Sequence, residues 1–135
     1  PEHLDLPMDY DAIGRAGSRM GTGTMIILDD KTCPVGFVKN LVDFFAQESC
    51  GFCTPCRDGL PWSGQVLDDI EAGRGRDEDI GTLEKQVKYI GAIGNTHCAL
   101  APGAIEPLQS ALHYFREDFD RHIAAQHCPY CDGGP

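Results

Sequence analysis

The stretch that most constrains the fold reads Glu48-Ser49-Cys50-Gly51-Phe52-Cys53-Thr54-Pro55-Cys56-Arg57-Asp58-Gly59. Its three cysteines are each separated by two residues, so they can present three sulfur atoms to one centre. The glycines and the proline among them favour the tight turns that let a backbone curl around such a centre. The stretch therefore predicts a loop wrapped around a metal centre.

A fourth thiolate is expected from a distant part of the chain. The best candidate is Cys98, because it lies in residues 94–103, a run that is also rich in Gly and Pro. A Cys-x-x-Cys-x-x-Cys run plus one remote cysteine is a recognised way of providing the four thiolates of a four-iron cluster. The spacing predicts a [4Fe–4S] cluster held by Cys50, Cys53, Cys56 and Cys98.

Three other interpretations of these cysteines stay open. Zinc also accepts four thiolates, although zinc sites usually come as two Cys-x-x-Cys pairs. A disulfide with spare thiols would require strained pairing among three close sulfurs. A catalytic thiol is the third, since His97 adjoins Cys98, but adjacent residues rarely face one another.

The residues around the cysteines could adjust the electrostatics of a cluster. Arg57 would offset thiolate charge, and Ser49, Thr54 and Thr96 could donate hydrogen bonds to sulfur, which raises a reduction potential. The alternative for the Ser and Thr residues is ordinary capping and turn formation. His97 is expected to be a loop residue rather than a ligand.

Four amphipathic helices are predicted over residues 31–124, because apolar residues recur there at spacings of three and four. The stripes are Val35, Val38, Leu41, Val42 and Phe45; Trp62, Val66 and Ile70; Ile80, Leu83, Val87 and Ile90; and Ile105, Leu108, Leu112, Phe115, Phe119 and Ile123. Pro34 and Pro61 suit helix starts, and Gly91 and Gly94 close the third helix. The pattern predicts a mainly α fold, a four-helix bundle that holds the cluster.

Residues 1–30 differ in character from the rest. Apolar residues at helical spacing predict a short helix over 9–20 ended by Gly21, and 22–28 is a β-branched and apolar run typical of a strand. A lone strand leaves its ladder groups unpaired. This opening is therefore expected to be the end of a mixed domain whose other strands lie elsewhere.

The segment 125–135 has no apolar periodicity and is predicted to be a flexible tail. Cys128 and Cys131, with His122 and His127 nearby, contain the donors of a two-Cys, two-His zinc site, which is the functional alternative. Cys33, directly before Pro34, is most simply a small apolar residue at a helix start.

Composition excludes several classes of function. The 135 residues carry a formal net charge of −10, which disfavours binding to nucleic acid or to an anionic membrane surface. The seven cysteines are too sparse for a secreted disulfide scaffold. No apolar run is long enough to span a bilayer, and the first residues do not read as a signal peptide.

The cysteine motif resembles the signature of the flavin- and NADH-binding subunit of proton-pumping NADH:quinone oxidoreductase, respiratory complex I. Residues 60–63 are similar to bacterial members, and residues 97–104 resemble the segment that provides the fourth ligand. Residues 8–22 are similar to the end of the β-grasp domain that precedes the helical bundle in that family. The resemblance covers about residues 1–124, and it implies that 1–30 is a β-grasp remnant.

The resemblance implies electron transfer from NADH through FMN to a four-iron cluster and onward to quinone. It implies a subunit of an NADH dehydrogenase, located in the cytoplasm and peripheral on the inner membrane, whose partners are other peripheral-arm subunits that carry iron–sulfur clusters. The Gly-rich region that binds FMN and NADH lies upstream of the β-grasp domain, so this segment alone is not expected to oxidise NADH. Soluble NAD-linked formate dehydrogenases and hydrogenases share the signature, and a zinc-stabilised helical interaction module is the alternative of another class.

Overall fold

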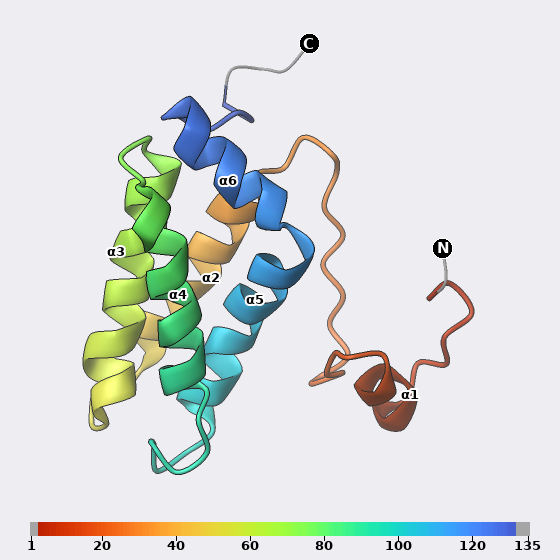
Figure 1. Cartoon of the computed structure of the whole chain (residues 1–135). Coiled ribbons are helices and arrows are strands. Elements are labelled where there is room, and N and C mark those ends of the chain that lie inside the picture. The colour runs from red at the N-terminus through yellow and green to blue at the C-terminus, as the bar shows by residue number, and fades with distance from the viewer. Residues whose placement is uncertain (1–2, 132–135) are drawn as a thin grey trace. The chain divides into compact units, whose positions relative to one another are not determined.

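The computed structural model describes residues 3–131 and is mostly helical, with no strand in that range. The chain divides into two compact units, Pro1–Asp30 and Lys31–Pro135. Figure 1 shows a short helix in the first unit and packed helices in the second.

Among residues 3–30 of the first unit, one helix is present, α1 (Tyr10–Arg15), whose N-terminus is capped by Asp9. The Asp9 carboxylate accepts a hydrogen bond of 2.7 Å from the backbone N–H of Ala12. The helix is shorter than predicted, and the expected end at Gly21 is wrong. Gly17 adopts a positive φ of 85° directly after the helix, and Ser18 N–H then donates to the Ile13 carbonyl.

The strand predicted over residues 22–28 is absent from this structure. Residues 22–28 are irregular and exposed, and the side chains of Met25, Ile26 and Ile27 are more than half exposed. The described part of the chain contains no strand that could pair with this run, so no ladder forms there. The apolar, β-branched composition is present, but a strand needs a neighbour.

The second unit begins with α2 (Pro34–Glu48), as predicted from Pro34. It continues with η1 (Pro55–Gly59), α3 (Leu60–Glu71), α4 (Asp77–Ile90), α5 (Leu100–Tyr114) and α6 (Arg116–Ala125). Successive helices from α2 to α5 run in alternating directions, and α6 lies across the end at which α2 begins (Figure 1). As a result, the loop after α2 and the loop after α4 lie at the same end, away from α6.

The core of the second unit is built from the inward faces of all five α-helices. Fully or almost fully buried side chains from these helices are Val35, Val42, Leu60, Leu67, Ile70, Leu83, Ile90, Ile105, Leu108 and Phe119. Most of these positions belong to the predicted apolar stripes. Trp62 is an exception, because its side chain is 55% exposed and Leu60 and Leu67 occupy the buried face of α3 instead.

The last predicted helix is two helices rather than one. The backbone leaves helical geometry at Phe115, with φ −123° and ψ 28°, and α6 starts at the next residue. Phe115 is 49% exposed, whereas Phe119 after the break is fully buried. The spacing of apolar residues continues through the break, so periodicity alone does not reveal it.

Helices α2 and α3 approach closely where small residues face acidic ones. A Cβ atom at Gly36 would lie 2.5 Å from a carboxylate oxygen of Glu71, and one at Gly64 would lie 2.5 Å from a carboxylate oxygen of Asp43. The two glycines therefore leave the space that lets these helices pack together.

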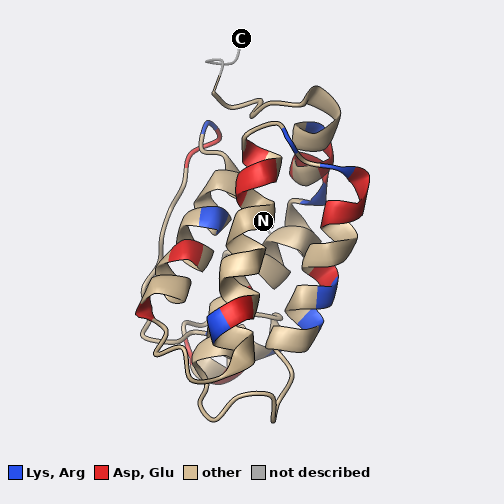
Figure 2. Ribbon diagram, turned by 90° about the vertical axis from the view of Figure 1, so that its left-hand side faces the viewer, with Lys and Arg blue, Asp and Glu red and all other residues tan. Residues whose placement is uncertain are grey.

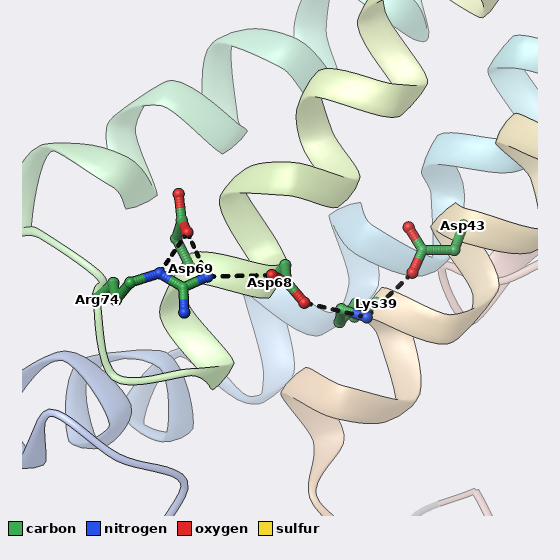
Figure 3. A network of polar contacts seen from close by, with 5 residues as sticks. All are labelled: Lys39, Asp43, Asp68, Asp69 and Arg74. Atoms are coloured by element: carbon green, nitrogen blue, oxygen red, sulfur yellow. Dashed lines mark hydrogen bonds and ion pairs between the residues drawn. The ribbon is translucent and has the colours of Figure 1, made fainter.

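A network of ion pairs joins the same two helices on the surface (Figure 3). Lys39 Nζ lies 3.2 Å from Asp43 Oδ2 and 3.4 Å from Asp68 Oδ1, and Arg74 binds Asp68 and Asp69. The hydrogen bond from Lys39 to Asp43 and the negative charges nearby raise the pKa of Lys39. Figure 2 shows acidic residues on several helices, some with basic residues beside them.

Candidate metal centre

The cysteine loop between α2 and α3 curls through one glycine and ends in a π-helical turn. Gly51 has a positive φ of 70°, and the Ser49 hydroxyl accepts a 3.0 Å hydrogen bond from its N–H. The turn η1 then carries Cys56 into the core, where its side chain is only 5% exposed. Cys53 is half-buried and Cys50 is exposed, so the three thiols run from the surface inward.

The second loop, between α4 and α5, presents Cys98 at the surface. The Asn95 side-chain amide donates to the Tyr89 carbonyl at 2.8 Å, which holds the loop to the end of α4. The Thr96 hydroxyl donates to the Cys98 carbonyl at 2.8 Å, so it shapes the turn before α5.

The two loops meet at Cys53. The backbone N–H of His97 donates to Cys53 Sγ at 3.5 Å, across 44 positions of sequence. The rings of Phe52 and His97 also contact each other, with centroids 5.4 Å apart. The loop predicted to provide the fourth thiol therefore contacts the cysteine loop through His97, the residue directly before Cys98.

A cavity of about 300 Å³ opens where the loops meet. Its lining comes from both loops and from the end of α4: Phe52, Cys53, Thr54, Pro55, Tyr89, Gly94, Asn95, Thr96 and His97. The walls of the cavity are mostly polar, and Cys53 is the one of the four cysteines in its lining.

The four thiols are not gathered tightly enough for a single ion. Among residues 3–131, Cys50, Cys53, Cys56 and Cys98 do not form a group whose donor atoms lie close enough together to hold one metal ion. A tetrahedral zinc with Zn–S bonds of about 2.3 Å needs sulfurs about 3.8 Å apart. In a four-iron cluster each thiolate binds a different iron, so the sulfurs stand further apart.

Of the Ser and Thr residues predicted to tune a cluster, two make turn contacts in this structure. Ser49 and Thr96 hold loop backbone atoms, as given above, and Thr54 makes no side-chain capping bond to η1. The Arg57 guanidinium lies 3.4 Å from the carbonyls of Gly51 and Phe52 and pairs with Asp58. Arg57 thus contacts atoms of its own loop. The hydrogen bond to Cys53 Sγ comes from the backbone N–H of His97, and the type of side chain at position 97 does not reveal it.

A sequence model of the family described as "NADH-ubiquinone oxidoreductase-F iron-sulfur binding region" matches residues 36–122. The chain belongs to this family. The match contains Cys50, Cys53, Cys56 and Cys98, together with both loops that line the cavity. A [4Fe–4S] cluster is the cofactor of this region.

Curated relatives of the iron-sulfur binding region are components of an oxidoreductase complex. The chain is 55% identical over 121 residues to the F subunit of the NADH-quinone oxidoreductase of Escherichia coli strain K12, covering 90% of this chain and 27% of that protein. It is 46% identical over 129 residues to the protein of the same name from Streptomyces coelicolor, covering 96% and 28%. The chain therefore spans about a quarter of the length of these relatives.

A solved structure shares the fold of the iron-sulfur binding region. It is titled as an NAD⁺-reducing [NiFe]-hydrogenase in the H₂-reduced state, and it aligns with a TM-score of 0.65 at 32% sequence identity. The alignment covers 79% of this chain and 17% of that chain. The fold of most of this chain is thus also found in an NAD⁺-reducing hydrogenase.

No helix of the described residues has the length and apolar character needed to cross a membrane. This agrees with the absence of a long apolar run in the sequence.

Proposed function

We propose that this chain holds the [4Fe–4S] cluster that receives electrons from FMN, within an NADH dehydrogenase that passes them on to quinone. Cys50, Cys53, Cys56 and Cys98 are the proposed ligands. The observation that carries the proposal is the 3.5 Å hydrogen bond from His97 N–H to Cys53 Sγ, because it brings the two cysteine loops together.

The chemistry of the donors supports this assignment. Four thiols and a mostly polar cavity of about 300 Å³ are gathered by two loops at one end of the helical unit. Such clusters take four Cys thiolates. The match of residues 36–122 to the iron-sulfur binding family favours the cluster over the zinc-stabilised alternative.

The residues of the chain would hold the cluster and set its potential. When bound, a [4Fe–4S] cluster supplies a site that accepts and gives up single electrons. The His97 N–H aimed at Cys53 Sγ stabilises added negative charge there, which raises the reduction potential. The packing of Cys56 in the core fixes the position of its thiolate.

The remaining parts of the assignment rest on the longer relatives. Helices α2–α5 are proposed as the four-helix bundle, with α6 crossing its end. Residues 1–30 are proposed as the end of a β-grasp domain, since the exposed run Met25–Leu28 would pair once the missing strands are supplied. The partners would be an upstream FMN- and NADH-binding domain and cluster-carrying subunits of the peripheral arm, on the cytoplasmic side of the inner membrane.

Anaerobic purification with iron and sulfide analysis tests the cluster. We expect a brown protein with about four irons per chain. Cys98→Ala should lower the iron count or leave a three-iron form, and helical content should fall, because metal binding and folding are coupled. Cys128→Ala is the matched control and should keep its iron. Stoichiometric zinc without visible absorbance, or normal iron in Cys98→Ala, would refute the ligand set.

A second setting for the same module is a soluble NAD-linked hydrogenase or formate dehydrogenase. The observation that favours it is the structural match to the NAD⁺-reducing hydrogenase. The 55% identity to the Escherichia coli NADH-quinone oxidoreductase relative over 90% of this chain favours the respiratory setting. Purification of the intact complex separates the two, since quinone reduction with NADH is expected only in the respiratory setting.

A further inference from the structure

A second group of metal-binding side chains lies at the opposite end of the helical unit from the cysteine loops. Cys33, His122 and Cys128 come from the start of α2, from α6 and from the segment after α6. Their donor atoms all lie within 4.8 Å of one another, and Cys33 Sγ is 3.3 Å from His122 Nε2. The sequence pattern groups His122 and Cys128 with His127 and Cys131 instead, and it predicts only a structural role for Cys33.

We propose that Cys33, His122 and Cys128 bind a zinc ion that fastens the end of α6 and the following segment to the start of α2. This site is separate from the proposed cluster and goes beyond the electron-transfer function. Two thiolates and one imidazole form the nitrogen and sulfur donor set that zinc prefers.

The distances match a tetrahedral zinc site. Zn–S bonds of about 2.3 Å and Zn–N bonds of about 2.0–2.1 Å place neighbouring donors about 3.6 Å apart. The observed 3.3 Å contact and the 4.8 Å limit for the group bracket that value. Small side-chain movements would therefore suffice to complete the site.

His122 is held in the orientation that a metal ligand needs. Its Nδ1 lies 2.7 Å from the Asp118 carbonyl, one turn earlier in α6, and donates its proton there. This fixes the tautomer in which Nε2 carries the lone pair and faces Cys33 Sγ. Metal-binding imidazoles commonly use their other ring nitrogen in this way. The ring is fully buried, so it has no hydrogen bond to solvent to lose.

The environment of Cys33 also suits a cation. Cys33 caps the N-terminus of α2, and its sulfur accepts a 3.2 Å hydrogen bond from Gly36 N–H, which favours the thiolate. A bound zinc would hold Cys33 as the thiolate, because a coordinating thiol loses its proton.

The segment after α6 is anchored beside the group. Tyr130 stacks on the His122 ring, its hydroxyl donates to the Asp118 carboxylate at 2.5 Å, and Arg121 donates to that hydroxyl at 2.9 Å. Cys128, in the same segment, is only 5% exposed. These contacts hold Tyr130 beside His122, and the flexibility predicted for residues 125–135 stays a prediction.

Cys131 is the candidate for the fourth ligand. It follows Cys128 at the Cys-x-x-Cys spacing of zinc sites, and its N–H closes the turn on the Cys128 carbonyl at 3.1 Å. A structural zinc site has four protein ligands, and the turn keeps this thiol in the segment that already supplies Cys128.

Metal analysis of the whole chain tests the proposal. The chain is produced with zinc in the medium, purified anaerobically with a reductant, and zinc and iron are counted in the same sample. We expect about one zinc per chain in addition to the cluster iron. Cys128→Ser should lose the zinc and keep the iron, and since Cys128 follows α6, the helical unit should stay folded, as circular dichroism would show. Cys33→Ser should behave in the same way.

The controls separate this site from the cluster. His127→Gln, at an exposed histidine one position from Cys128, should keep the zinc. Cys98→Ala should lose iron but keep zinc. The proposal is overturned if the wild-type chain holds no zinc, if zinc survives in both Cys128→Ser and Cys33→Ser, or if zinc falls only in Cys98→Ala. A Cys33–Cys128 disulfide found by peptide mapping of the purified chain would also overturn it.

Discussion

Replacing Gly73 with alanine should destabilise the helical unit through a clash of backbone with backbone. Gly73 ends α3 with a positive φ of 75°, and the next N–H, of Arg74, donates to the Asp69 carbonyl at 2.7 Å. A Cβ atom there would lie 2.0 Å from the carbonyl oxygen of Gln126. No side-chain rotation relieves such a contact, so the segment after α6 must move.

Two costs add up at this position. Left-handed geometry costs an alanine about 1–2 kcal/mol, and forced displacement of packed atoms costs about 1–3 kcal/mol more. We therefore expect Gly73→Ala to lower the free energy of unfolding by about 2–5 kcal/mol. Gly94→Ala is the matched control, because Gly94 also has a positive φ but a Cβ atom there meets nothing within 4 Å. It should cost only about 1–2 kcal/mol.

Urea denaturation followed by circular dichroism measures both variants. In a chain that ends at Ala125, Gln126 is gone, so Gly73→Ala should cost no more than Gly94→Ala. Equal costs for the two variants in the whole chain, or an undiminished Gly73→Ala cost in the shortened chain, would refute the clash. The same variant should weaken zinc binding, since Gln126 precedes Cys128 by two residues.

Three further predictions concern packing and charge. Phe119→Ala should cost about 3–5 kcal/mol in urea, because Phe119 is fully buried, whereas Phe44→Ala, at a ring that is 52% exposed, should cost far less. Lys39→Met should cost about 0.5–1 kcal/mol at low salt and less at high salt; a cost that does not change with salt would contradict the ion-pair account. Trp62, the single tryptophan and 55% exposed, should be quenched by acrylamide almost as well in the folded chain as in urea, and strong protection of the folded chain would contradict its placement.

Local sequence signals predicted the helices well. Pro34 before an apolar stripe predicted α2, and Gly91 after Ile90 predicted the end of α4, because helix starts and ends depend on a few neighbouring residues. The break at Phe115 was missed, since the apolar spacing runs through it unchanged. The failed strand over residues 22–28 shows the opposite case, in which the composition suits a strand and only pairing partners are missing.

The family membership confirms the prediction of a [4Fe–4S] cluster. The choice of Cys98 as fourth ligand stays a prediction, supported by the contact of its loop with Cys53. The hydrogen-bond donor at that contact is a backbone N–H, and every residue except proline has one. Side-chain types therefore could not have singled out His97 N–H.

The amino-acid sequence by itself determined the chemistry of this protein: the thiols, their spacing in the loop, and the periodic apolar faces that make the chain helical. Those features are local, and local rules of turn and helix formation act on neighbouring residues. Only the tertiary structure decided which distant groups meet. It joined Cys33 to His122 across 89 positions, with Cys128 beside them, because α6 turns back at Phe115 and lies over the start of α2. Contacts of that kind depend on where whole helices pack, and nothing in the neighbourhood of any one of the three residues specifies it.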